Sequence, residues 1–183
     1  MQKGKIIFLN GVSSSGKTTL AKELQERLIE PYYGLSIDTF AAMLPYKFGP
    51  HNIREGYPIF LKAVSMMPYT IKAFSDMGLN TIADHVITHD DCLQECVETL
   101  YEHPVLFVHV TCPLEELLRR EKERGDRHPQ AEATLPRLLP QNTYDITVDT
   151  HNNTKQECAA NIIKMLNYPE KFTAFKMLWS HRT

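Results

Sequence analysis

One stretch near the N-terminus constrains the fold of this chain more than any other. It matches the phosphate-binding loop pattern G-x-x-x-x-G-K-[ST] at every fixed position. Its residues are Gly11, Val12, Ser13, Ser14, Ser15, Gly16, Lys17 and Thr18, followed by Thr19. Residues 5–9 before it form a continuous apolar run suited to a buried strand, and residues 19–24 after it follow a helical pattern. This context favours a nucleotide phosphate site over a Gly/Ser-rich turn that merely caps a helix.

The residue types in the loop suit the chemistry of phosphate binding. We expect Gly11 and Gly16 to adopt backbone angles closed to other residues, so that successive N–H groups point inward. Together with the positive end of the helix dipole, these groups make a cradle for phosphate oxygens. Lys17 should reach the β- and γ-phosphates, and the Thr18 hydroxyl is placed to ligate Mg²⁺.

Size and composition predict a soluble chain with one core. The sequence has 183 residues, of which 43% are hydrophobic and 23% charged, so we expect residues 1–183 to form a single domain. A net charge of −2 gives no general attraction for nucleic acid or an anionic membrane. We see neither a signal-like segment nor an apolar stretch of membrane-span length, and we therefore expect a cytoplasmic location. The oligomeric state is not readable.

The four cysteines do not form a metal-binding pattern in the sequence. Cys92 and Cys96 lie one helical turn apart, but neither a second pair nor a nearby histidine at metal spacing completes a zinc site. We interpret them as reduced structural thiols. The histidines at 85, 89 and 128 lie near expected site loops and are more typical of surface or supporting residues than of catalysts.

Strand and helix patterns alternate along the chain. Besides the first strand, strand patterns cover residues 34–37, 79–83, 105–110 and 144–150. This order predicts an α/β fold, a doubly wound parallel five-stranded sheet with helices on both faces, which the phosphate loop makes a P-loop NTPase fold. Between them, residues 45–58 predict an irregular connection, and residues 59–77 predict a helix that Pro68 kinks or splits.

Two aspartates follow predicted strands and are expected at the carboxyl edge of the sheet, where ligands bind. Asp38 is the first candidate for a catalytic base, although its residue type equally suits a helix N-cap. Asp84 lies where P-loop enzymes place the aspartate that holds Mg²⁺, usually through water.

A charge run follows the fourth strand pattern. Arg120, Arg124 and Arg127 are spaced three or four apart, so they can share a helix face, whereas Glu121 and Glu123 fit ordinary surface ion pairs. The alternative is a solvated helix face throughout. We favour an arginine-rich lid over about residues 119–143 that closes over the transferring phosphate and excludes water.

The C-terminal part of the chain carries one clear helix signal. Thr154 and Glu157 make a capping box, which predicts a helix from Lys155 to about Leu166. Residues 169–183 predict a short aromatic helix packed on the body.

On these motifs the chain resembles the chloramphenicol phosphotransferase-like family of small P-loop kinases. The resemblance rests on residues 9–17, 37–38, 82–84, 120–127 and 144–150, and it covers about residues 5–165. It implies in-line transfer of the γ-phosphoryl group of ATP, with Mg²⁺, to a hydroxyl of a small molecule such as chloramphenicol. It also implies that Asp38 is the base that takes the hydroxyl proton and that Arg120, Arg124 and Arg127 are the lid arginines. Contacts to the nucleotide base are implied for Arg120 and the segment around Asp149 and Thr150. The segment from Lys47 to Met67 departs from chloramphenicol-acting members, because it is rich in Pro, Tyr and Met instead of glycine.

Two other functions stay open at this point. A kinase of another metabolite, of the shikimate, gluconate, nucleoside or sugar type, keeps the same fold and changes the acceptor. A nucleotide-dependent switch or ATPase would respond to a protein partner, but the chain has no N-K-x-D motif for guanine.

Overall fold

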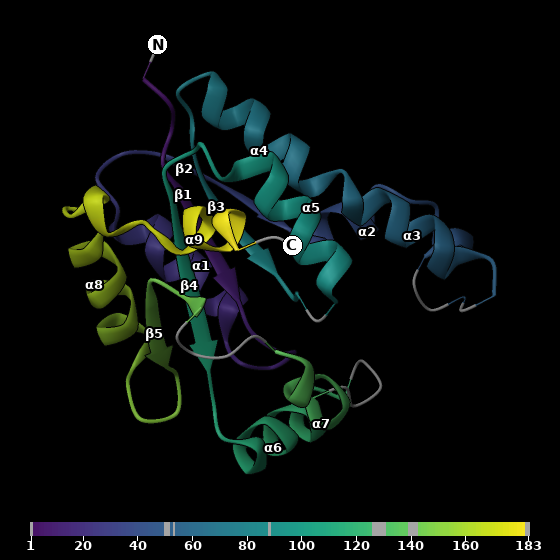
Figure 1. The fold of residues 1–183 in the computed structure, drawn as a ribbon. Helices are drawn as coiled ribbons and strands as arrows, with labels where there is room; N and C mark the ends of the chain where they lie inside the picture. Colours follow the sequence, from purple (N-terminus) through teal and green to yellow (C-terminus); the bar gives the residue numbers. More distant parts are fainter. Residues whose placement is uncertain are drawn as a thin grey trace.

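A parallel β-sheet at the centre of the molecule positions the phosphate loop. The computed structural model describes residues 2–49, 52, 54–87, 89–125, 131–138 and 143–181. The strands are β1 (Ile6–Asn10), β2 (Tyr32–Ser36), β3 (Asn80–His85), β4 (Val105–Thr111) and β5 (Ile146–Asp149). They are ordered β2-β3-β1-β4-β5, and every neighbouring pair is parallel (Figure 1). The predicted five-stranded P-loop sheet is confirmed.

Helices connect the strands and cover both faces of the sheet. The α-helices are α1 (Lys17–Arg27), α2 (Ile37–Ala42), α3 (Gly56–Ser65), α4 (Met67–Asp76), α5 (Asp90–Leu100), α6 (Leu114–Arg124), α7 (Ala131–Thr134), α8 (Lys155–Met165) and α9 (Ala174–Ser180). Short 3₁₀ turns are η1 (Tyr46–Phe48), η2 (Leu135–Arg137) and η4 (Pro169–Lys171). Among the described residues, no helix is both long enough and apolar enough to cross a membrane.

The core lies in two layers, one on each face of the sheet. The central strands direct apolar side chains to both faces, and each face is covered by helices. On one face, Leu20 and Leu24 of α1 and Ile162 of α8 pack against the sheet. On the other face, α4, α5 and α9 supply the layer (Figure 1). Phe175 of α9 packs onto Phe8 and Phe107 at the sheet centre. A third, small cluster joins Val12 of the phosphate loop to α6 and α7.

Several local sequence signals produce the expected elements. The long predicted helix is split into α3 and α4 at Met66, and Pro68 lies in the first turn of α4, where a missing N–H is tolerated. Gly78 follows α4 with a φ of 78°, as a helix-ending glycine does. The capping box at Thr154 is present and starts α8. The aromatic tail forms α9, in which Trp179 stacks on Tyr101, the residue that follows α5.

The second strand begins two residues before and ends one residue before the predicted range 34–37. Strand β2 ends at Ser36, whose hydroxyl accepts a hydrogen bond from the N–H of Thr39 and so caps α2. Asp38 therefore lies in the first turn of α2, and it is neither the last strand residue nor the N-cap. A negative charge in a first turn is stabilised by the helix dipole, which explains why this residue type suits the position.

Candidate active site

The phosphate loop connects β1 to α1 through backbone conformations that few residues adopt. Gly16 has a φ of 93° and precedes α1, and Ser14 also takes a positive φ, of 62°. The expectation for Gly11 was wrong in its reason, because its φ does not lie in the left-handed region. Gly11 is required by packing instead, since a Cβ there would lie 2.3 Å from the carbonyl oxygen of Val110 in β4.

The loop presents polar groups that lack partners within the protein. Among the described residues, the hydroxyl oxygens of Ser14 and Ser15 are buried without a hydrogen-bond partner. Buried polar groups without a partner are costly, so such groups in a native structure call for an explanation such as a ligand. Two such hydroxyls on a loop that leads into the N-terminus of α1 fit phosphate oxygens as that ligand.

The Lys17 side chain is buried at the centre of the loop. Its Nζ donates a hydrogen bond to the carbonyl oxygen of Val12 at 2.8 Å and lies 3.9 Å from Oδ1 of Asp84. Burial lowers the pKa of Lys17, and the negative charges of Asp84 and Asp38 oppose that effect. An ammonium held at such cost is typical of a functional position, and it is set to neutralise an anion placed on the loop.

Thr18 and Asp84 form a pair of oxygen ligands at the carboxyl edge of the sheet. The Thr18 hydroxyl donates to Oδ2 of Asp84 at 2.6 Å, and Asp84 is 9% exposed. Asp84 is the penultimate residue of β3, directly opposite Leu9 of β1. Hydroxyl and carboxylate oxygens are the donors that Mg²⁺ prefers, so this pair fits the predicted metal position.

Asp38 lies on α2. Its side chain is exposed, and its negative charge partly opposes the lowering of the Lys17 pKa that burial causes. The structure therefore brings Asp38, Asp84 and Lys17 into one electrostatic group at the edge of the sheet. Asp84 is hydrogen-bonded to Thr18, whereas Asp38 belongs to the solvent-facing side of the site.

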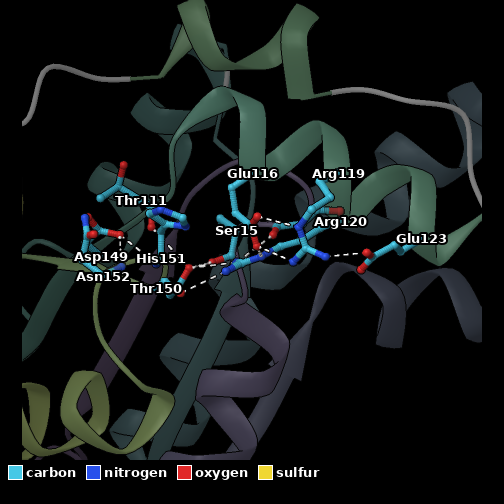
Figure 2. Close-up of polar contacts among 11 residues, drawn as sticks. Ser15, Thr111, Glu116, Arg119, Arg120, Glu123, Asp149, Thr150, His151 and Asn152 are labelled. Carbon is cyan, nitrogen blue, oxygen red and sulfur yellow. Dashed lines mark hydrogen bonds and ion pairs between the residues drawn. The ribbon is translucent and has the colours of Figure 1, made fainter.

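Arg120 of α6 is held against the loop after β5. Its Nη1 donates to the hydroxyl of Thr150 at 3.0 Å, and its Nη2 donates to the Thr150 carbonyl at 2.9 Å (Figure 2). Nη1 also lies 3.4 Å from the carbonyl oxygen of Ser14. The Thr150 hydroxyl in turn donates to the carbonyl of Ser15 at 2.7 Å. Arg120 and Thr150 thus connect α6 and the turn after β5 to the phosphate loop, and we call these two residues the clasp.

A carboxylate that sequence reasoning missed orients Arg120. Glu116, one helical turn earlier, accepts a hydrogen bond from Nε of Arg120 at 2.7 Å and two from Arg119 (Figure 2). Hydrogen bonds from Arg119 and then Arg120 lower the pKa of Glu116 to about 2. The i to i+4 spacing of Glu116 and Arg120 was the available signal. Arg119 is directed instead to the helix surface, where it also pairs with Glu123 as expected.

The remaining lid residues divide into three groups. Arg124 reaches the loop, with Nη2 3.3 Å from the hydroxyl of Ser13, and α6 ends at Gly125. Glu121 was wrongly expected on the surface: it is 5% exposed and accepts a hydrogen bond from the N–H of Ala131, which fixes α7 onto α6. Arg127 lies outside the described residues, so only two of the three predicted lid arginines can be placed.

The other predicted nucleotide contacts are divided between the loop and the turn after β5. Thr19 is exposed in the first turn of α1. Asp149 directs its carboxylate into its own turn, where it accepts hydrogen bonds from the N–H groups of His151 and Asn152 (Figure 2). Asp149 therefore shapes the turn that presents Thr150.

The sheet order, the phosphate loop and the Thr18–Asp84 pair together define a P-loop kinase fold and site. Within that class, the chain belongs to the chloramphenicol phosphotransferase-like protein family, which matches residues 4–167. It is 32% identical over 184 residues to a Mycobacterium tuberculosis protein named as a candidate O-phosphotransferase, covering 88% of this chain and 82% of that relative.

More distant relatives are kinases as well. An adenylyl-sulfate kinase of Clostridium acetobutylicum is 26% identical over 180 residues, covering 90% of this chain and 84% of that enzyme. The solved structure of the Mycobacterium tuberculosis APS kinase with AMPPNP and APS superposes with a TM-score of 0.69 at 17% identity, over 91% of this chain and 99% of that one. The chain is thus a phosphotransferase, a kinase of the class that uses an alcohol group as acceptor.

Proposed function

We propose that this protein transfers the γ-phosphoryl group of ATP to a hydroxyl group of a small molecule, with chloramphenicol-like alcohols as the first candidate acceptors. One observation carries the proposal: the carboxylates of Asp84 and Asp38 both act electrostatically on the buried ammonium of Lys17, and Asp84 also accepts a hydrogen bond from Thr18. Asp84 comes from β3 and Asp38 from α2, and we assign Asp84 to the metal side of the site and Asp38 to the acceptor side.

The proposed reaction assigns a role to each of these groups. The acceptor oxygen attacks the γ-phosphorus, the bond to the β–γ bridging oxygen breaks, and ADP leaves. Asp38 accepts the hydroxyl proton as the P–O bond forms. Lys17 and the arginines at 120 and 124 stabilise the negative charge on the transferring group and hold the phosphates in place.

Mg²⁺ fits the oxygen donors of Thr18 and Asp84, and when bound it would neutralise phosphate charge. For the nucleotide we propose the loop residues 11–19 as the phosphate site. Arg120, Asp149 and Thr150 would lie beside the nucleotide base. Arg120 and Thr150 are hydrogen-bonded to the Ser14 and Ser15 carbonyls, so these residues border the phosphate loop. A reaction that consumes ATP agrees with the cytoplasmic location expected from the sequence.

The elements next to Asp38 supply the acceptor side of the site. Helix α2 packs against α3, and η1 lies between them in the chain. Large apolar side chains in this region are exposed, namely Met43, Tyr46, Tyr57, Ile59, Leu61 and Met66. A surface of this kind near a carboxylate base suits a small acceptor with an aromatic or apolar body and a free hydroxyl. This supports an acceptor with an apolar body over a highly charged one, while the departure of residues 47–67 from chloramphenicol-acting members keeps other apolar alcohols as candidates.

The base assignment is tested with Asp38→Asn, which keeps the size of the side chain and removes its ability to accept the proton. We expect transfer to fall by about 10² to 10⁴-fold while ATP affinity stays within a few-fold of wild type. Asp90→Asn is the matched control, because Asp90 lies in the first turn of α5 as Asp38 lies in that of α2. Normal transfer by Asp38→Asn would disprove the assignment.

The acceptor is identified by a coupled ATP-turnover assay with Mg²⁺ over a panel of hydroxylated compounds. The panel contains chloramphenicol, other hydroxylated antibiotics, shikimate, gluconate, nucleosides, amino sugars and adenylyl sulfate. Turnover with a phosphorylated chloramphenicol product supports the proposal in full. Turnover with another member changes the acceptor and keeps the mechanism. ATP hydrolysis that no small molecule stimulates, and that a protein partner does, would favour the switch function instead.

A further inference from the structure

One histidine and two cysteines form a cluster of possible metal ligands close in the chain to Asp84 of the predicted magnesium position. His85 is the last residue of β3, and Cys92 and Cys96 are one turn apart on α5. The ligand atoms of these three side chains lie within 4.8 Å of one another, and Nε2 of His85 is 3.9 Å from Sγ of Cys92. The sequence analysis assigned no histidine partner to the two cysteines, although His85 lies only seven residues before Cys92. Packing of α5 beside the end of β3 brings the three side chains together.

We propose that His85, Cys92 and Cys96 bind a thiophilic divalent cation of the zinc class. In a tetrahedral zinc site with Zn–S near 2.3 Å and Zn–N near 2.0 Å, neighbouring ligand atoms are about 3.6 to 3.8 Å apart. The cluster is already within about 1 Å of that spacing, so side-chain torsions alone can close it. Two thiolates and one imidazole are a ligand set that selects zinc-like ions over Mg²⁺.

The His85 ring can offer a nitrogen to such a cation. The residue is 2% exposed, and its Nε2 contacts the Cys92 sulfur at 3.9 Å, which is at the outer limit for sulfur hydrogen bonds. This weak contact leaves the Nε2 lone pair available for a metal ion, and neutral imidazole nitrogen is a common ligand of zinc-like ions.

The three proposed ligands also line a cavity, which leaves room for a fourth ligand. A space of about 180 Å³ is lined by His85, Cys92 and Cys96 together with Val64 of α3 and Glu95 of α5. Three protein ligands and an open side are the arrangement that leaves room for a water molecule or a carboxylate as the fourth ligand. Two carboxylates line the same cavity and are candidates for that position: Asp91, which precedes Cys92, and Glu95, which precedes Cys96.

Metal binding here would connect the cavity to the predicted catalytic edge. His85 directly follows Asp84 in β3, and α5 carries both cysteines. A bound cation would fix the end of β3 against α5 and so limit the movement of Asp84. Because binding to the folded state alone raises stability by mass action, the cation should also raise the melting temperature.

The first test uses the reduced full-length protein with excess Mg²⁺, so that the Thr18–Asp84 pair is occupied. Co²⁺ is added as a spectroscopic substitute for zinc. We expect one equivalent to bind, with the sulfur-to-metal charge-transfer band of thiolate ligation and the visible bands of tetrahedral cobalt, and Zn²⁺ should displace it. Absence of the thiolate band, or no stoichiometric binding, would overturn the proposal without the need for any variant.

Variants then locate the ion. Cys92→Ser and Cys96→Ser should each weaken Zn²⁺ binding by at least about 100-fold and remove the melting-temperature increase that Zn²⁺ produces. Cys158→Ser is the matched control, because Cys158 is also a buried free thiol but packs on the opposite face of the sheet. If the Cys92→Ser and Cys96→Ser variants bind Zn²⁺ as tightly as the wild-type protein, this location of the site is contradicted.

Discussion

The two halves of the predicted active site differ in how firmly the fold holds them. On the donor side, Lys17 and Asp84 are buried, and Arg120 is fixed by hydrogen bonds to Thr150 and Glu116. On the acceptor side, Asp38 is exposed, and the nearby apolar side chains of η1 and α3 extend into solvent. The predicted phosphate-binding residues therefore lie at the buried edge of the sheet. The predicted acceptor surface lies on peripheral elements, whose residues can change without disturbing the core.

Lys17→Ala, on the donor side, is expected to have the largest effect on phosphoryl transfer. We expect transfer to fall by about 10³-fold or more, because the variant removes the buried cation that neutralises the transferring phosphate. Lys22→Ala, which changes an exposed lysine of the same helix, should leave turnover unchanged. The measurement is the coupled ATP-turnover assay. A loss of less than tenfold would mean that Lys17 does not contact the reacting phosphate.

Gly11→Ala tests how tightly the phosphate loop is packed against the sheet. The added Cβ would lie 2.3 Å from the Val110 carbonyl, so backbone must move, and we expect a loss of about 2 to 4 kcal/mol in the free energy of unfolding. Gly34→Ala is the control, since its Cβ would meet only the end of the flexible Gln25 side chain, at 3.2 Å. Chemical denaturation measures both. Equal stability of the two variants would show that the loop yields more easily than its contacts indicate.

Arg120→Ala should weaken nucleotide binding without unfolding the protein. The variant removes the clasp between α6 and the turn after β5, and we expect the KM for ATP to rise by about 10 to 100-fold, corresponding to charge-assisted hydrogen bonds of about 1.5 to 3 kcal/mol. Arg119→Ala is the matched control one position away, because that side chain pairs with Glu116 and Glu123 on its own helix. If both variants bind ATP equally well, the clasp has no role in nucleotide binding.

The smallest effects are expected on the acceptor side. Tyr46→Ser removes an aromatic side chain that is 84% exposed, so stability should change by less than about 0.5 kcal/mol. We expect a rise of up to tenfold in the KM for the acceptor and no change in the KM for ATP. Met177→Ser, at an exposed apolar residue on α9, is the control. A change in the KM for ATP would contradict the division of the site into two halves.

Local signals were sufficient for much of the fold because their causes are local. The phosphate loop, the proline that splits α3 from α4 and the capping box of α8 each act through a few neighbouring residues. Errors arose where a long-range contact decided the outcome. Gly11 is constrained by a strand ninety-nine positions later in the chain, and Glu121 is buried because α7 folds back on α6. Neither contact leaves a periodic trace in the sequence.

The sequence by itself determined the class of site, because a strand, a phosphate loop and a helix follow one another within about twenty residues. Only the tertiary structure decided which distant side chains share that site. It paired Thr18 with Asp84, attached Arg120 to Thr150 and placed His85 beside Cys92 and Cys96. Thr18 meets Asp84, and Arg120 meets Thr150, because the parallel strands β1, β3 and β5 end at one edge of the sheet, and the order of strands is set by packing of the whole chain. His85 meets the two cysteines because α5 packs beside the end of β3.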